Sequence, residues 1–76
     1  MTKEVVFFEM CGADLIELRE SAELSQQQLA HLWRVTQQRI SQMESDRDCF
    51  MVEKKKVTLI TDYKRSLLDI RKLHAL

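Results

Sequence analysis

Amide and guanidinium side chains gather in one short segment of the chain, where they could read the edges of DNA bases. Residues 36–44 read Thr-Gln-Gln-Arg-Ile-Ser-Gln-Met-Glu, and three more glutamines stand at 26–28. Gln pairs bidentately with adenine, and Arg pairs with guanine or with a phosphate. A surface with only a structural role more often carries Glu and Lys, which solvate better and form i,i+4 pairs. The enrichment in Gln therefore favours a base-reading surface over a purely structural one.

Two short helices would position these side chains. Ser25 is an N-cap candidate, and Gln28 completes the capping-box pattern for a helix at 26–32. Thr36 is the N-cap candidate for the next helix, at 37–44. Two short helices joined by a turn of three or four residues make a helix-turn-helix unit.

The predicted helix-turn-helix, residues 25–44, has its own small core. Ala30 stands where the two helices would cross, and its small side chain permits close approach. The apolar contacts between the helices would come from Leu29, Val35 and Ile40. Trp33, in the turn, fits the core better than a contact with a partner.

The rest of the chain predicts a mainly α fold with a short N-terminal strand at 4–8, a helix at 13–22 and a C-terminal helix at 62–75. The isolated strand must pair with later chain or with a second subunit. Segment 48–61 has two interpretations, a β-hairpin turning at the charged run 53–56 or a helix. We favour the helix, because no Gly or Asn-Gly marks a hairpin turn.

Composition excludes several classes of protein. The 76 residues make one small domain, and they hold no apolar run long enough to span a membrane and no secretory signal. One Gly and no Pro argue against a turn-rich all-β fold. A domain of this size buries only about 60% of its unfolded surface, so we expect a homodimer.

Catalytic and metal chemistry find little support. His31 and His74 are far apart, and Cys11 and Cys49 lack the spacing of zinc ligands. We therefore expect neither an enzyme nor a cofactor or metal site. The sequence leaves a disulfide open, but we favour two reduced thiols in a cytoplasmic protein.

The formal net charge is zero, with 12 basic and 12 acidic residues, yet the charges are unevenly distributed. Residues 1–20 hold two basic and five acidic side chains, whereas residues 51–76 hold seven and three. Lys54, Lys55 and Lys56 could meet phosphates, or they could form an ordinary solvated face. Net neutrality is therefore compatible with a nucleic-acid partner.

Several short motifs of the chain together resemble the Cro/CI-type (XRE) helix-turn-helix family. They are Leu-x-Glu-Leu-Arg at 15–19, Leu24-Ser-Gln26, Leu29-Ala30 and Ile40–Glu44. The segment is especially similar to lambdoid-phage repressors and Cro proteins, and the resemblance runs from Leu15 to Arg47. It implies a lambda-repressor-like fold. It also implies a sequence-specific transcriptional regulator, a repressor, that binds an inverted-repeat operator in double-stranded DNA as a homodimer. Helix 37–44 would enter the major groove.

The resemblance also assigns roles to single residues. Gln37 and Gln38 would read base edges, and Gln26 would bind a phosphate and brace Gln37. Arg19 and Glu44 match a family pair that forms a partly buried salt bridge. Arg39, Ser41 and Gln42 would reach bases or neighbouring phosphates, and Thr36 could contact a phosphate as well as cap its helix. Arg34 and Arg47 could add phosphate contacts that the resemblance does not assign.

The chain departs from the family at three positions where Gly is usual, which here are Glu23, Arg34 and Asp46. Arg34 falls where the turn needs a left-handed residue, which costs a non-Gly residue roughly 1 kcal/mol. The turn is therefore distorted, or Arg34 is kept for a phosphate contact. Asp46 places a negative charge where the family approaches the DNA backbone. An alternative function is a protein-interaction module, such as an antitoxin that binds a toxin and regulates its own operon.

Overall fold

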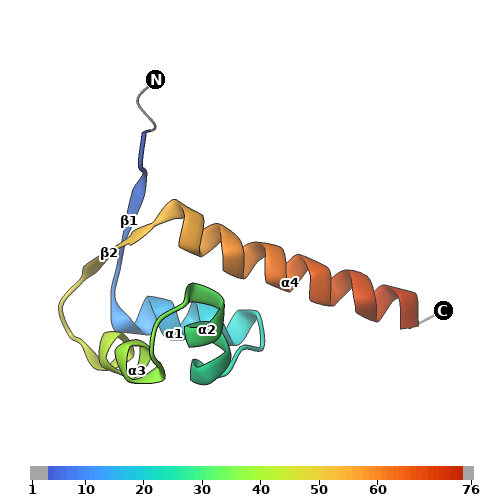
Figure 1. Cartoon of the computed structure of the whole chain (residues 1–76), viewed down its shortest axis with the longest axis horizontal. Coiled ribbons are helices and arrows are strands. Elements are labelled where there is room, and N and C mark those ends of the chain that lie inside the picture. Colours follow the sequence, from blue (N-terminus) through green and yellow to red (C-terminus); the bar gives the residue numbers. More distant parts are fainter. Residues whose placement is uncertain (1–3, 75–76) are drawn as a thin grey trace.

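Four helices and a two-stranded antiparallel sheet make up residues 4–74, the part of the chain that the computed structural model describes (Figure 1). In chain order they are β1 (Phe7–Met10), α1 (Gly12–Ser21), α2 (Gln26–Trp33), α3 (Gln37–Ser45), β2 (Phe50–Glu53) and α4 (Lys54–His74). The prediction of a mainly α fold with an N-terminal strand and a C-terminal helix is confirmed.

The caps of the helix-turn-helix are those that the sequence predicts. Ser25 Oγ accepts the Gln28 N–H at 3.0 Å, and Gln28 Oε1 accepts the Ser25 N–H at 2.8 Å. This reciprocal pair satisfies two donors that α2 would otherwise leave open. Thr36 Oγ1 accepts the Arg39 N–H at 3.1 Å at the start of α3. Both helices run one residue beyond their predicted ends.

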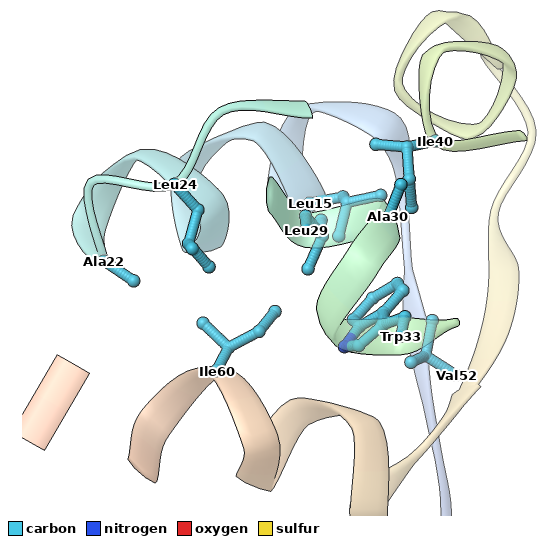
Figure 2. Packing of buried hydrophobic residues seen from close by; sticks show 9 residues of the cluster. All are labelled: Leu15, Ala22, Leu24, Leu29, Ala30, Trp33, Ile40, Val52 and Ile60. Atoms are coloured by element: carbon cyan, nitrogen blue, oxygen red, sulfur yellow. The ribbon is translucent and has the colours of Figure 1, made fainter. Parts of the chain in front are cut away.

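Helices α1, α2 and α3 enclose the core on one side, and α4 closes it from the other (Figure 2). Ile60 of α4 points into the cluster, and the Trp33 ring lies beside Val52 of β2. The predicted contacts Leu29 and Ile40 are fully buried, and Val35 packs against their edge. The whole buried set is Leu15, Ala22, Leu24, Leu29, Ala30, Trp33, Ile40, Val52 and Ile60.

The single glycine marks a close approach between two helices. Gly12 lies just before the predicted helix at 13–22, but it is buried as the first residue of α1. An added Cβ would lie 2.9 Å from the carbonyl oxygen of Met43 and closer still to that of Glu44. The absence of a side chain therefore lets the start of α1 touch the end of α3.

The strand predictions need correction. The N-terminal strand runs over Phe7–Met10 rather than 4–8, and its partner is β2, with Phe8 opposite Val52. For segment 48–61 the favoured helix is right from Lys54 onward, where α4 begins, and wrong for Phe50–Glu53, which is extended. The alternative, a hairpin turning at 53–56, is wrong, because that charged run lies largely in α4. The alternation of β2 buries Val52 and leaves its neighbour Met51 exposed.

The C-terminal helix is longer than predicted. It runs without interruption from Lys54 to His74, so a separate helix beginning at Asp62 is wrong, and the predicted end at Ala75 lies outside the described residues. The Thr61 hydroxyl donates to the Val57 carbonyl within α4 at 3.2 Å, one turn earlier in the same helix. The helix thus continues past the core that it covers (Figure 1).

Candidate nucleic-acid interface

Helix α3 presents a polar face to solvent and a single apolar anchor to the core. Gln37, Gln38, Arg39 and Gln42 are exposed, whereas Ile40 is completely buried. Of the side chains predicted to read DNA from this helix, Ser41 alone is half-buried. The helix lies on the opposite side of the core from α4 (Figures 1 and 2), so its polar face is open to a large partner.

The turn between α2 and α3 is regular although it lacks glycine. Arg34 adopts the left-handed conformation, with φ 57° and ψ 44°. The Val35 N–H bonds to the Ala30 carbonyl at 2.9 Å, and the Arg34 N–H bonds to that of His31 at 3.2 Å. These two bonds are those of a Schellman motif. The expectation of a left-handed residue is confirmed, the alternative of a distorted turn is wrong, and the side chain of Arg34 points to solvent.

The end of α1 repeats this arrangement. Glu23 has φ 57°, the Leu24 N–H bonds to the Arg19 carbonyl at 3.1 Å, and the Glu23 N–H bonds to that of Glu20 at 2.9 Å. Asp46, the third position where the family usually has Gly, is different, because its φ of −74° suits any residue. Two of the three departures from the family therefore carry a backbone cost, and the third does not.

A network of charged side chains ties the three helices together. Arg19 Nε lies 2.7 Å from Glu44 Oε2, and Arg19 Nη2 donates to Glu44 Oε1 at 3.2 Å. Arg19 Nη1 also donates to the Leu24 carbonyl at 2.7 Å, and Gln26 Nε2 donates to Glu44 Oε1 at 3.0 Å. The side chains of Arg19 and Glu44 are only 14% and 5% exposed. This partly buried bidentate pair, which the family resemblance implies, fixes the end of α3 relative to α1 and α2.

The sequence placed Gln26 differently from the structure. Its amide nitrogen donates to Glu44 rather than bracing Gln37. The half-buried side chain of Gln26 therefore belongs to the network that holds α3, and a contact with phosphate would have to use its remaining N–H. Spacing gives no signal for this role, because Gln26 and Glu44 are brought together only by the packing of α2 on α3.

Four basic side chains line two adjoining shallow pockets beside the turn. Arg34, Lys55 and Lys56 line the first, and Arg39 and Lys56 line the second. Lys56 Nζ lies 5.6 Å from the centre of the Trp33 ring, close enough for a cation–π contact.

Trp33 itself is a core residue, as predicted. Its side chain is 5% exposed, and its Nε1 donates to the Lys56 carbonyl at 3.0 Å. The contact brings the lysine run at the start of α4 next to the helix-turn-helix. The sequence gives no sign of this proximity, because the two segments are far apart in the chain.

The loop after α3 is exposed at Asp46, Arg47 and Asp48. Asp46 Oδ1 accepts the Asp48 N–H at 3.3 Å, which closes the loop on itself. Arg47 is therefore accessible but lies between two carboxylates, so its attraction for a phosphate is weakened.

Within residues 4–74, no three His, Cys, Asp or Glu side chains gather as ligands for a metal ion. None of the helices in the same range has the length and apolarity to cross a membrane.

Comparison with known proteins gives one finding that bears on this interface. A family model described as helix-turn-helix, of the XRE, Cro/CI-like kind, matches residues 15–54, which is more than half of the chain. No curated protein and no solved structure gives a significant match. The matched region contains α2, α3, the Arg19–Glu44 pair and β2.

Proposed function

The chain belongs to the XRE family of Cro/CI-like helix-turn-helix proteins and is a DNA-binding transcription regulator of that kind, and we propose that it is a repressor. It would occupy an inverted-repeat operator as a homodimer and block transcription there. Two copies of α3 would enter successive major grooves about 34 Å apart.

One observation carries this proposal: an exposed row of amides on a helix that is rigidly held. Gln37 and Gln38 project from the first turn of α3, where a recognition helix meets base edges. The ion pair between Arg19 and Glu44 anchors the other end of the same helix. Because the helix backbone is already fixed, binding costs little backbone entropy, and hydrogen bonds from these amides can distinguish bases. The open surface at Arg39, Lys55 and Lys56 would add contacts with phosphates.

We propose that the homodimer forms through the far end of α4. Ile60 is buried and Tyr63 packs against the core. Leu67 is half-buried, and Ile70 continues this stripe at the spacing of one helical face, while Leu73 widens it. Ile70 is 52% exposed and Leu73 is 75% exposed, so the apolar stripe extends beyond the part of α4 that the core covers. A second copy seated there would leave α3 free, because α4 lies across the core from α3 (Figure 1).

The sheet is the competing dimer surface. Val5, Phe7 and Met51 are 60%, 47% and 61% exposed. Phe7 and Met51, however, line the same shallow pocket as Arg39. A second copy bound there would lie beside the helix that meets DNA, which favours α4 as the dimer contact.

DNA readout is tested by footprinting on the DNA upstream of the protein's own gene. Protection of two half-sites, with a steep loss of binding as salt rises, is expected. Changing Gln37 and Gln38 to Ala should abolish the footprint. The matched control is Gln27→Ala, an exposed glutamine that lines a pocket with Tyr63 of α4. Failure to bind this DNA at low salt, or equal loss in the control, would reject the repressor function.

The dimer is tested separately by sedimentation. Ile70→Glu combined with Leu73→Glu should give a monomer with unchanged helical content and weakened operator binding. Val5→Lys combined with Phe7→Lys is the matched control and should stay dimeric. The reverse pattern would move the dimer contact to the sheet, and a monomeric unmodified protein would reject the dimer.

A second candidate function is the binding of a protein partner, as an antitoxin binds a toxin. Within the described residues, the only feature that favours it is the exposed apolar surface at the sheet. A dimer through α4 leaves Val5, Phe7 and Met51 uncovered. A protein seated on them would lie next to Arg39 and would couple partner binding to DNA binding. Under this function the Val5→Lys, Phe7→Lys variant keeps its operator but no longer binds the co-expressed product of the adjacent gene.

A further inference from the structure

Cys11 and Cys49 face each other just beyond the end of the sheet. Met10 pairs with Phe50, so the next position of the same register places Cys11 opposite Cys49. The Lys54 N–H bonds to the Val6 carbonyl, so Val6 and Lys54 form a hydrogen-bonded pair of the same ladder. Pairs alternate along an antiparallel ladder, so Cys11 and Cys49 fall at a non-hydrogen-bonded position, where Cα atoms are about 4.5 Å apart. That separation is within the range that disulfides span.

The side chains meet as the backbone register requires. The two sulfur atoms lie 2.6 Å apart, and both cysteines carry free thiols. Cys49 is exposed and Cys11 is half-buried, so a small oxidant can reach the pair from solvent. No rearrangement of the backbone is needed to join them, since each sulfur is already directed at the other.

We propose that Cys11 and Cys49 are a site of reversible oxidation, which forms an intramolecular disulfide on exposure to a small disulfide such as oxidised glutathione. The thiolate of one cysteine attacks a sulfur of the oxidant and releases one glutathione thiolate, which takes up the proton that the cysteine lost. The second cysteine then attacks the mixed disulfide and releases the second glutathione in the same way. Two protein thiols are oxidised to one disulfide, and one oxidised glutathione is reduced to two thiols.

The surroundings make this exchange depend on pH. The pKa of Cys49 is raised from 9.0 to about 11, first by the hydrogen bond with Cys11, and then by desolvation and by charge repulsion from Cys11, Glu9 and Asp14. Cys49 therefore keeps its proton near neutral pH, and exchange that begins with attack by Cys49 should accelerate as the solution becomes alkaline.

The disulfide would close a loop that contains the whole helix-turn-helix. Helices α1, α2 and α3 all lie between Cys11 and Cys49 in the chain. The exposed side chains of α3 take no part in the bond. A link across a long loop stabilises the native state chiefly by restricting the unfolded chain. Oxidation should therefore raise thermal stability without altering the residues that read DNA, so the site acts on the lifetime of the folded regulator.

The test is chemical and needs no DNA, so its failure is distinguishable from failure of the repressor function. The purified full chain is equilibrated in glutathione buffers of increasingly oxidising reduction potential and then alkylated with iodoacetamide. Its mass is measured by mass spectrometry. The expected oxidised product is a chain with no covalent link to another chain, which lacks two hydrogen atoms and carries no alkyl group. Its thermal midpoint should rise by on the order of 10 °C.

Two matched variants complete the experiment. Cys11→Ser and Cys49→Ser should each take one alkyl group or one glutathione and show no such rise in midpoint. The proposal is overturned if the unmodified chain remains doubly alkylated in fully oxidised glutathione. It is equally overturned if the unmodified chain accumulates as a mixed disulfide with glutathione or as a chain-to-chain disulfide.

Discussion

Replacing Arg34 by glycine should stabilise the domain, although it removes a charged side chain from the surface. Arg34 holds φ at 57° in the turn between α2 and α3, and the left-handed conformation costs an L-residue roughly 1–2 kcal/mol. Glycine avoids that cost, but it also raises the conformational entropy of the unfolded chain, which lowers the free energy of unfolding by about 0.5–1 kcal/mol. The net gain in the free energy of unfolding should therefore be about 0.5–1 kcal/mol. For a domain of this size that is a rise of about 3–6 °C in the thermal midpoint.

The assay is urea unfolding followed by circular dichroism, with two further glycine variants as controls. Glu23→Gly removes the same backbone cost, and the ion pair that it loses, with Arg71, joins two half-exposed side chains and is worth little. Asp46→Gly relieves nothing, because φ at this position is −74°, and should destabilise by about 0.5–1 kcal/mol. A loss of stability in Arg34→Gly, or an equal gain in Asp46→Gly, would refute the reasoning from backbone conformation.

The same variant separates stability from binding. If Arg34 contacts a phosphate, Arg34→Gly binds the operator less tightly, and the slope of log K against log salt falls in magnitude by about 0.9 for each of the two copies in the homodimer. A more stable protein with weaker, less salt-dependent binding is the expected result.

Three further predictions concern packing and charge. Glu44→Ala should lower the free energy of unfolding by about 3–5 kcal/mol in urea titration, because it leaves the guanidinium of Arg19 partly buried without its carboxylate; a loss below 1 kcal/mol would mean that solvent already screens the pair. Gly12→Ala should shift the urea midpoint down with an unchanged slope, since its methyl group collides with the backbone of α3; an unchanged midpoint would show that the two helices can separate freely. Cys49 should react with iodoacetamide increasingly between pH 9 and 11, and Cys11→Ala should move this rise toward the usual thiol range. The raised pKa favours the thiol form in the fold, so its contribution to stability is complete below pH 9 and is lost as the pH rises through about 11.

Local features of this fold could be predicted from the sequence. The caps Ser25 and Thr36 bond to N–H groups three residues away, so neighbouring residues contain all the information. The left-handed turn at Arg34 could be predicted because the family resemblance marks the position. The partner of β1 could not, since its pairing with Phe50–Glu53 depends on how the intervening helices return the chain.

The candidate site divides in the same way. Exposure of Gln37 and Gln38 follows from the helical period and the anchor at Ile40. The link between Gln26 and Glu44 arises only after α2 and α3 have packed, and so does the position of Lys56 over Trp33. Such contacts leave no trace in local spacing.

The position of Trp33 makes its fluorescence a direct report on the contact between α4 and the rest of the domain. It is the single tryptophan of the chain, and its indole N–H is bonded to the first turn of α4 while its ring packs beside Val52. Detachment of α4 from the body would expose the indole to water and change its fluorescence, even with the helix-turn-helix intact. Comparison of this signal with circular dichroism would show whether α4 leaves before the domain unfolds or together with it.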